Sequence, residues 1–183
     1  MSKWKVVIPD RVQPPAHFEQ EIFGPLADVV CLGAHKNAEM IGKIEDADAI
    51  LAWHDLQWNK DIINTLSNCK AIIRVGTGYD NVDLAAAKQK NIVVCNIPDY
   101  GTNDVADHAI SLLMSLARGL MAHNRLSKQG PSHWKWGQTR TFRLTGKNLG
   151  IIGLGAIGTA AALRAKALGM NVAYYDPYKG VGP

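Results

Sequence analysis

The sequence predicts an α/β protein built on parallel sheets, and two observations support this class. Over the first hundred residues, short apolar runs rich in Val and Ile alternate with segments of helical character. From residue 148 to 177, a strand-like run, a glycine-rich turn, an Ala-rich helix and a second strand-like run follow in that order. Both patterns are typical of strand–helix–strand units, in which the strands are parallel.

The first hundred residues are expected to hold five strands. They cover residues 5–8, 28–32, 49–53, 71–75 and 92–96. These runs are apolar with little polar alternation, as in strands that are buried on both faces. The helices expected between them cover residues 17–25, 38–44, 60–66 and 82–90, and Asp80 or Asn81 can cap the last of these. Such a set of elements predicts a doubly wound sheet.

The remaining residues begin with an expected long helix over 103–127, capped by Thr102 or Asn103. Its apolar residues recur at helical spacing, which suits a strut between two domains. Residues 129–146, with Trp134 and Trp136, are expected to form an irregular loop. A strand over 149–152, a helix over 160–168 that ends at Gly169, and a strand over 172–175 follow.

The turn after residue 152 carries the spacing G-x-G-x-x-G in Gly153, Gly155 and Gly158. Gly153 permits a tight turn, Gly155 lets backbone N–H groups approach a pyrophosphate, and Gly158 lets helix and strand pack closely. Asp176, at the end of the second strand, is placed to accept hydrogen bonds from ribose hydroxyls, and its charge favours NAD over NADP. The alternative is an ordinary strand–helix–strand unit whose glycine turn binds nothing.

A second glycine-bearing segment, IIRVGTGYDNVDL, covers residues 72–84. A buried strand runs into Gly76, Thr77 and Gly78, at the carboxyl end where open α/β sheets bind ligands. Neighbouring backbone N–H groups can hold a carboxylate without a charged side chain. A strand-to-helix turn that merely needs glycine is the alternative, and this segment alone does not decide between the two.

Composition bears on whether the protein binds nucleic acids, metals or membranes. The net charge is +4 with basic residues scattered singly, which gives no support for nucleic-acid binding. Cys31, Cys69 and Cys95 form no metal pattern and lie in or beside apolar runs, so buried thiols in a reducing compartment are expected. No signal peptide or apolar run of membrane-spanning length is present, so we expect a cytoplasmic protein with no membrane partner and no metal.

Three motifs together resemble a known family. The segments RVGTGYDNVD, NIVVCNIPDYGTNDVADHAISLLMSLAR and LGIIGLGAIG with YYDP look like the D-isomer-specific 2-hydroxyacid dehydrogenases. The segment NIPDYGTNDVADHA is most similar to a branch of this family that resembles the C-terminal binding proteins, and phosphoglycerate dehydrogenases are the next most similar branch. The resemblance covers nearly the whole chain and keeps the order of the family's motifs.

The resemblance implies a flavodoxin-like substrate domain over residues 1–100. Residues 101–183 would then hold a linker helix and the first strand–helix–strand unit of a Rossmann coenzyme domain. It implies an NAD-dependent oxidoreductase that oxidises a small 2-hydroxy acid or reduces a 2-oxo acid. A homodimer through the coenzyme domain and the helix over 103–127 is also implied. The alternative function is an NAD(H)-sensing scaffold without catalysis, as in a corepressor.

Site residues follow from positions in the motifs. The resemblance places the substrate carboxylate on backbone N–H groups of Thr77 and Gly78, with Thr77 also near the nicotinamide. The positions that it implies for NAD binding are Thr77, Val105, Gly153, Gly155, Ala156, Ile157, Gly158 and Asp176. Ala156 and Ile157 would contact the pyrophosphate, and Asp176 the adenosine ribose.

The family's catalytic Arg, Glu and His have no match within these residues and are expected downstream of Pro183. We therefore expect the 183-residue chain to be inactive alone. His54 follows the strand over 49–53 and is expected to touch a substrate side group, with an exposed loop histidine as the alternative. His108, on the long helix, is expected to have a structural role, and neither histidine is assigned as the catalytic base.

Overall fold

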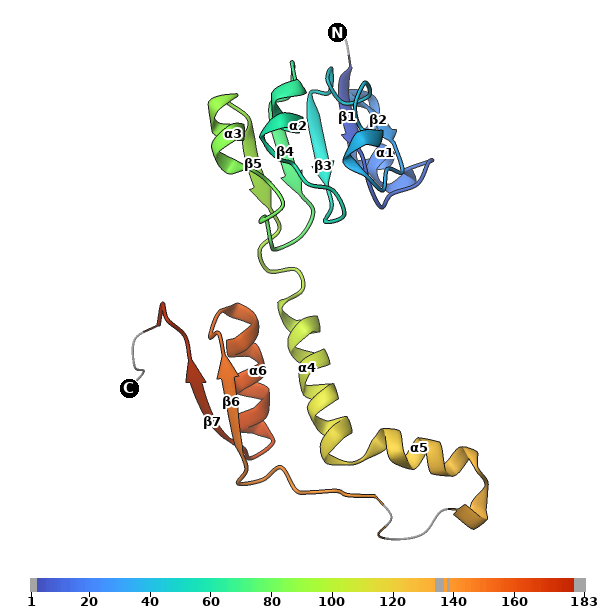
Figure 1. Cartoon of the computed structure of the whole chain (residues 1–183), viewed down its shortest axis with the longest axis vertical. Helices are drawn as coiled ribbons and strands as arrows, with labels where there is room; N and C mark the ends of the chain where they lie inside the picture. The colour runs from blue at the N-terminus through green and yellow to red at the C-terminus, as the bar shows by residue number, and fades with distance from the viewer. Residues whose placement is uncertain (1–2, 134–136, 138, 180–183) are drawn as a thin grey trace. The chain divides into compact units, whose positions relative to one another are not determined.

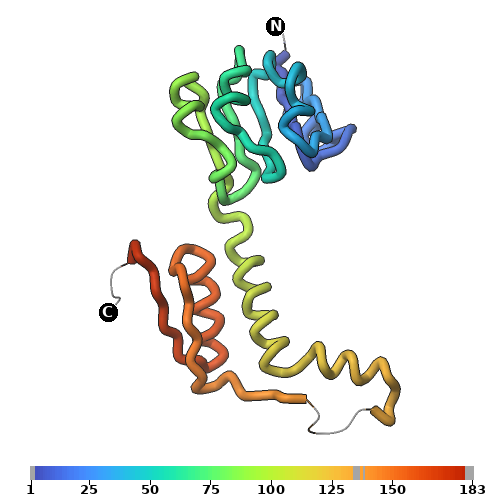
Figure 2. The backbone as a smooth tube through the Cα atoms, in the orientation of Figure 1, coloured from blue at the N-terminus to red at the C-terminus, as the bar shows by residue number. Residues whose placement is uncertain are grey.

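The computed structural model describes residues 3–133, 137 and 139–179. The chain divides between Tyr100 and Gly101 into two compact units, and each is described by itself. Figures 1 and 2 trace the chain from the five-stranded first unit to the smaller second unit.

The first unit is a five-stranded parallel sheet. Its strands are β1 (Trp4–Ile8), β2 (Ala27–Cys31), β3 (Ala49–Ala52), β4 (Ala71–Arg74) and β5 (Val93–Asn96). Their order is β2-β1-β3-β4-β5, which is the flavodoxin-like order of a doubly wound sheet. This confirms the predicted fold class. All five carboxyl ends lie at one edge of the sheet, because every neighbouring pair is parallel.

One face of this sheet carries the main buried cluster of the unit. The helices of the unit are α1 (His17–Phe23), α2 (Lys60–Thr65) and α3 (Leu84–Gln89), with single 3₁₀ turns η1 (Gly24–Leu26) and η2 (Asn37–Glu39). Ile50 and Ile72 of the central strands pack with Ile63 of α2 and Ala87 of α3 in one buried apolar cluster. Burial of such side chains is the main favourable term in folding.

The opposite face is covered less completely. Side chains alternate along a strand, so Val6 and Ala49 point away from the buried cluster that holds Val7 and Ile50. Phe23, at the end of α1, lines with them an apolar hollow of about 340 Å³. Helix α1 therefore covers this face only in part.

The predicted helix over residues 38–44 is wrong. The structure has only η2 followed by turns, and Gly42 adopts a φ of 81° that right-handed helices exclude. The Glu45 carboxylate accepts hydrogen bonds from the backbone N–H groups of Gly42 and Ile44, at 2.7 and 3.0 Å. These side-chain contacts replace the helical backbone ladder.

The predicted cap of the helix after residue 81 is also wrong. Helix α3 starts at Leu84, and Asp83 is its cap because its side chain accepts the N–H of Ala86. Asn81 is buried, and its side-chain amide donates to the carbonyls of Trp53 and Leu56. The side chain of Asn81 therefore joins two loops.

The second unit is smaller. Its elements are α4 (Thr102–Ala117), α5 (Leu120–Lys128), a 3₁₀ turn η3 (Pro131–His133), β6 (Asn148–Ile152), α6 (Ala156–Ala167) and β7 (Asn171–Tyr175). Strands β6 and β7 are parallel, with Leu149 opposite Val172. The order β6-α6-β7 is the predicted strand–helix–strand unit. Trp134 and Trp136 of the expected loop lie outside the described residues.

The single long helix predicted over 103–127 is two helices. Gly119, between α4 and α5, has a φ of 62°, and the two helix axes bend by 62° at the break. A Cβ on Gly119 would lie 2.3 Å from Cγ2 of Thr139, so the later chain fills the bend. In the described part of the chain, no single helix is long and apolar enough to cross a membrane, and only this bent pair meets that test when taken together.

The start of α4 also differs from the prediction. Its cap is Gly101, and no side chain makes a capping hydrogen bond there, so Thr102 and Asn103 do not act as caps. Asn103 instead accepts from Nη2 of Arg164 in α6. Arg164 also donates from Nε to Asp107 at 2.5 Å, which ties α4 to α6. Helices α4 and α6 lie side by side in both views (Figures 1 and 2).

The three cysteines differ in exposure. Cys69 is buried, Cys31 is partly buried and Cys95 is exposed on strand β5. The expectation of three buried thiols is therefore wrong for Cys95. Strand β5 is at the edge of the sheet, and its alternate residues, including Cys95, are exposed. The residues before Cys95 in the sequence are apolar, so the sequence does not indicate that this strand is at an edge.

Candidate functional site

The turn after β6 is shaped by two glycines. Gly153 donates its N–H to the carbonyl of Tyr175 at 2.8 Å and adopts a φ of 90°, which favours glycine. A Cβ on Gly158 would lie only 2.0 Å from the carbonyl oxygen of Gly153. The close approach of α6 to the end of β6 therefore requires glycine at 158.

Gly155 differs from these two glycines. Its φ is −73°, which any residue can adopt, and a Cβ there would have no atom of the described chain within 4 Å. The backbone outside the turn is therefore open at this position. Nothing within the described fold requires a glycine at 155, and the absence of a side chain there leaves room for close approach by a ligand.

Asp176 closes the same turn from the end of β7. Its Oδ2 accepts the backbone N–H of Leu154 at 2.7 Å, and its Oδ1 accepts that of Tyr178 at 2.9 Å. Hydrogen bonds from these amides, Tyr178 first and then Leu154, lower the pKa of the carboxyl below its ordinary value of 3.8. The group is therefore a carboxylate at neutral pH, and an ionised carboxylate has acceptor positions beyond the two in use.

The first turn of α6 offers unused donors. Helix α6 begins at Ala156 after Gly155, and Thr159 is the first residue of this stretch that donates back, to Gly155 O. Within the described ranges, no acceptor is hydrogen-bonded to the backbone N–H groups of Gly155 to Gly158. Free N–H groups and the positive end of a 12-residue helix favour a phosphate group. The residues around the turn thus fit the pyrophosphate and ribose of a dinucleotide.

Val105 lies in the second unit on the first turns of α4. Its side chain is 49% exposed. It belongs to the same short stretch as Asn103 and Asp107, which Arg164 of α6 holds. Ile157, on the first turn of α6, is also partly open to solvent, at 38%. Both apolar side chains are therefore available to a ligand.

The first unit carries the second candidate site, at the carboxyl end of β4. Asn96 at the end of β5 donates from Nδ2 to the carbonyl of Thr77 at 2.8 Å. The Thr77 hydroxyl donates to the carbonyl of Ile97 at 3.2 Å, and the Ile97 N–H donates to the carbonyl of Gly76 at 3.0 Å. These three hydrogen bonds tie the loop over residues 76–78 to the end of β5.

The same loop presents backbone donors. Thr77 and Gly78 are exposed, and in the part of the chain that the structure describes neither backbone N–H has a hydrogen-bond acceptor. Consecutive free N–H groups form a concavity that suits an anion. The geometry therefore allows a carboxylate to bind at Thr77 and Gly78.

Two residues around this loop were not predicted from the sequence. Arg74 and Asn96 are opposite each other in the register of β4 and β5; Arg74 donates to the carbonyl of Val75, directly before the loop over 76–78, and Asn96 donates to that of Thr77. The available signal was their position: each is the last residue of a strand at the carboxyl edge of the sheet. Their contacts depend on strand pairing, which the sequence does not give directly.

His54 lies at the same edge of the sheet, after β3. Its side chain is 52% exposed, and Nε2 lies 2.8 Å from Nη2 of Arg11, which follows β1. Arg11 also pairs with Asp55, with Nε 2.7 Å from Oδ2. His54 is therefore an exposed loop histidine with a cationic and an anionic neighbour. His108 is exposed on α4.

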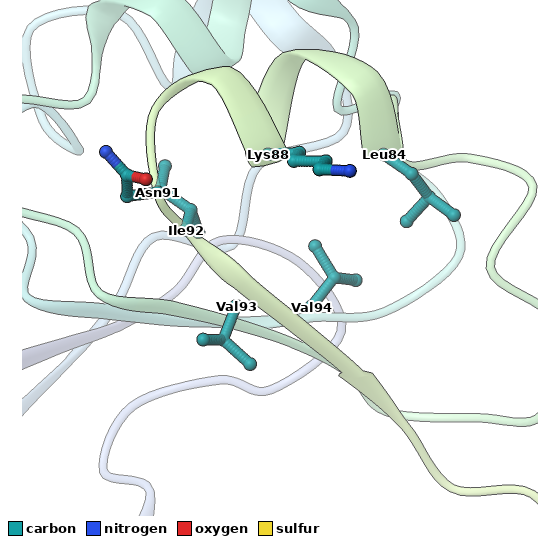
Figure 3. A pocket seen from close by; sticks show the side chains of 6 residues that line it. All are labelled: Leu84, Lys88, Asn91, Ile92, Val93 and Val94. Atoms are coloured by element: carbon teal, nitrogen blue, oxygen red, sulfur yellow. The ribbon is translucent and has the colours of Figure 1, made fainter.

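Another hollow of the first unit lies elsewhere. It has a volume of about 390 Å³ and is lined by Leu84 and Lys88 of α3, by Val93 and Val94 of β5, and by Asn91 and Ile92 between them. Figure 3 shows Val94 pointing toward α3 and Val93 pointing to the other side of the strand. This hollow is open and lies at the amino end of β5, away from the loop over 76–78. Among the described residues, no group of His, Cys, Asp and Glu side chains could hold a metal ion.

A family model and a curated relative both place this chain among 2-hydroxyacid dehydrogenases. The model of the D-isomer specific 2-hydroxyacid dehydrogenase catalytic domain matches residues 6–174. A D-3-phosphoglycerate dehydrogenase of Methanocaldococcus jannaschii is 39% identical over 140 residues, which are 76% of this chain and 26% of that protein.

Solved structures agree in fold. A glyoxylate reductase from Paecilomyes thermophila is 27% identical with a TM-score of 0.82, over 99% of this chain and 58% of that one. A D-lactate dehydrogenase from Aquifex aeolicus, complexed with NAD and lactic acid, is 25% identical with a TM-score of 0.82, over 96% and 52% of the two chains. The chain thus spans just over half the length of these two structures. Since the family model matches residues 6–174, which include most of both units, this chain belongs to the D-isomer-specific 2-hydroxyacid dehydrogenases.

Proposed function

We propose that the chain is part of an NAD-dependent oxidoreductase that interconverts a small 2-hydroxy acid and its 2-oxo acid. The first unit is the substrate domain, and the second unit is the linker and the opening of the coenzyme domain. The observation that carries the proposal is the hydrogen bond between Asp176 and the glycine turn. It places a carboxylate beside the free N–H groups at the start of α6, where Gly158 allows the helix to approach β6 closely.

The cofactor, when bound, supplies the nicotinamide carbon that exchanges a hydride with C2 of the substrate. The N–H groups of Gly155 to Gly158 would hold its pyrophosphate, and Val105 and Ile157 would give apolar contacts. Asp176 would accept hydrogen bonds from the adenosine ribose. Its negative charge would repel a 2′-phosphate, which favours NAD over NADP.

The substrate carboxylate would bind to the N–H groups of Thr77 and Gly78. Asn96 fixes the Thr77 carbonyl, so the loop is ordered before the substrate arrives. Such preorganisation orients C2 and its hydroxyl for transfer. His54 and Arg11, at the neighbouring loops, would face the substrate side group.

The residues that exchange the hydroxyl proton are not assigned within this chain. No position in residues 1–183 matches the Arg, Glu and His that the family resemblance implies. We expect the 183-residue chain to show no turnover by itself, while the complete gene product is active.

A homodimer is proposed through α4, α5 and the coenzyme domain. These two helices expose large apolar side chains: Leu112, Met114, Leu116, Leu120 and Met121. Exposed apolar side chains on neighbouring turns favour burial against a partner. A second copy of the same helices is the partner we propose.

The test uses the complete gene product with NADH and a panel of 2-oxo acids that includes glyoxylate, pyruvate and hydroxypyruvate. Oxidation of NADH with at least one of them, and a lower dissociation constant for NADH than for NADPH, is expected. Tight NADH binding without turnover on any acid would instead favour an NAD(H)-sensing scaffold. Absence of nucleotide binding would contradict both functions.

A further inference from the structure

We propose that one end of the second unit, opposite the glycine turn, binds single-stranded nucleic acid. This interaction goes beyond the proposed function and does not depend on it. Residues 108–175 hold nine Lys and Arg residues and no Asp or Glu, whereas the net charge of the whole chain is only +4. The rest of the chain is therefore net negative, and the positive charge is concentrated in the second unit.

The fold gathers cations that are scattered singly along the sequence. Phe142 donates its backbone N–H to the carbonyl of Ala117 at 3.0 Å, and a Cβ on Gly119 would lie 3.5 Å from the carbonyl oxygen of Arg140. The segment before β6 therefore runs along the bend between α4 and α5. Figure 1 shows this bend at the end of the unit away from the turn between β6 and α6.

Two lysines lie at the same end. Lys147 directly precedes β6, and Lys166 is in the last turn of α6. The N–H of Gly146 donates to the carbonyl of Gly169 at 2.7 Å, so the start of β6 adjoins the end of α6. Together with the bend, these elements form the basic end of the unit. Its exposed cations are Arg118, Arg125, Lys128, Arg140, Arg143, Lys147 and Lys166.

The charges of the basic end are not neutralised within the unit. Among the described residues, none of these cationic side chains forms an ion pair, and the basic residue of this unit that does so is Arg164, with Asp107. The next carboxylate along the chain, Asp176, lies at the glycine turn. Unpaired cations on one surface favour a polyanion, because its phosphates neutralise several of them at once.

Phe142 favours a single strand as this polyanion. Its side chain is 47% exposed, and it lies between Arg140 and Arg143 in a segment that is neither helix nor strand. An exposed ring can stack on an unpaired base while neighbouring guanidinium groups bind phosphates. The bases of a duplex are stacked on each other, so the ring would have no such partner there.

An anionic lipid surface would attract the same cations. It would also need exposed apolar side chains that enter the bilayer. The apolar side chains of the bend, Leu116, Leu120 and Met121, are those assigned above to the dimer interface. The observations therefore favour nucleic acid over lipid.

The basic end is separate from the proposed nucleotide site. Helix α6 has 12 residues and is therefore about 18 Å long, with the free N–H groups at its first turn and Lys166 at its last. A nucleic acid at the basic end leaves the glycine turn open. We therefore expect NADH and the nucleic acid to bind at the same time.

The test uses the complete gene product and the fluorescence anisotropy of a labelled uridine strand of about 20 nucleotides at about 50 mM salt. We expect a micromolar or lower dissociation constant. Its logarithm should rise with that of the salt concentration by about 0.7 for each phosphate bound. The triple variant Arg118→Gln/Arg140→Gln/Arg143→Gln should raise the constant at least about tenfold and lower this slope by about 2.

Phe142→Ala separates stacking from charge. It should raise the dissociation constant about tenfold and leave the salt slope unchanged, because stacking on a base releases no counterions. A duplex of the same length should bind more weakly than the single strand. A duplex bound as tightly as the single strand would overturn the assignment to single strands.

A second triple variant is the matched control. Lys36→Gln/Lys43→Gln/Lys60→Gln removes the same charge from exposed positions of the first unit and should change the constant by less than about twofold. The affinity of each variant for NADH should stay within about twofold of that of the wild type, which shows that the variant is folded. Saturating NADH should leave strand binding unchanged.

Equal losses in the two triple variants would overturn the proposal, because they would indicate attraction by net charge alone. A wild-type protein that binds NADH but not the strand would overturn it, as would displacement of the strand by NADH. Vesicles of phosphatidylcholine and phosphatidylserine test the other polyanion. Binding to these vesicles without binding to the strand would overturn the proposal in favour of a lipid surface.

Discussion

The backbone N–H of Leu154 donates to Oδ2 of Asp176 at 2.7 Å, which joins the middle of the glycine turn to the end of the second strand. Asp176 therefore has two tasks in this fold. It fixes the turn through Leu154 and Tyr178, and it is a carboxylate at the point where a ribose would lie. A carboxylate with two accepted hydrogen bonds keeps acceptor positions for two hydroxyls.

Substitution at Asp176 separates these tasks. Asp176→Asn keeps one acceptor oxygen, for Leu154, but loses the negative charge and the acceptor for the N–H of Tyr178. We expect NADH binding to weaken about tenfold and the preference over NADPH to fall, because the 2′-phosphate is no longer repelled. Fluorescence titration with both nucleotides measures this. An unchanged ratio of the two dissociation constants would mean that Asp176 does not read the ribose.

The two glycines Gly158 and Gly155 give a matched pair. Gly158→Ala places a Cβ 2.0 Å from the Gly153 carbonyl oxygen, and we expect a loss of roughly 1–3 kcal/mol in the free energy of unfolding. Gly155→Ala meets no atom of the described chain, so stability should change little while NADH affinity falls. Thermal unfolding and nucleotide titration of both variants test this. Equal destabilisation by the two substitutions would contradict it.

The Arg164–Asp107 pair links α6 to α4. Asp107 is 63% exposed, so the pair should contribute only about 0.5 kcal/mol. Arg164→Ala should cost more than Asp107→Ala, since Arg164 also donates to Asn103 and to the carbonyl of Ala160. A double-mutant cycle in urea isolates the pair energy. A coupling energy near zero would leave packing and the Arg164–Asn103 hydrogen bond to hold the two helices together.

The cysteines should react in the order of their exposure. Burial raises the pKa of the Cys69 thiol to about 11 and, with the charge of Glu19, also raises that of Cys31, whereas Cys95 is exposed. At pH 8 a disulfide reagent should modify Cys95 first and Cys69 only on unfolding. Because the folded pKa of Cys69 is raised, its contribution to stability is present below pH 9 and is lost as the pH rises through about 11.

Mass spectrometry of peptides from a reaction time course identifies the modified residue. Cys95→Ser serves as the control, because it should remove the fast phase alone. Rapid modification of Cys69 in the folded protein would contradict the burial of this side chain.

The proposed dimer depends on the apolar side chains of α4 and α5. Leu116 and Met121 are 74% and 73% exposed, so Leu116→Glu with Met121→Glu should leave each subunit folded. Placing two charges in an apolar interface is expected to raise the dimer dissociation constant by at least about 100-fold. Light scattering over a range of concentrations measures this, with exposed Glu21→Gln on α1 as a control. An unchanged mass would exclude this surface from the interface.

Most of the fold could be predicted because its signals are local. Apolar runs of strand length located all seven strands to within one or two residues. The two wrong helix predictions also have local causes. Gly42 and the Glu45 side chain prevent a helix over 38–44, and Gly119 divides the helix expected over 103–127. In each case a glycine at positive φ outweighed helical periodicity.

The candidate sites were predicted less completely. Thr77, Gly78 and the glycine turn were proposed from their places in the family's motifs, because a glycine at the end of a strand also serves ordinary turns and does not by itself mark a ligand site. Arg74 and Asn96 were missed, since an Arg or Asn at the end of an apolar run is ordinary in sequence. The exposed state of Cys95 was missed for a similar reason, because the sequence does not say which strand is at an edge.

The sequence by itself determined the fold class and the places of the described strands, because these depend on the periodicity of apolar residues. Only the tertiary structure decided which side chains support each loop. Asn96 reaches Thr77, and Asp176 reaches Leu154, across about twenty residues of chain. Such contacts arise from parallel strand pairing, which places distant carboxyl ends side by side, and the register of that pairing is a property of the packed sheet.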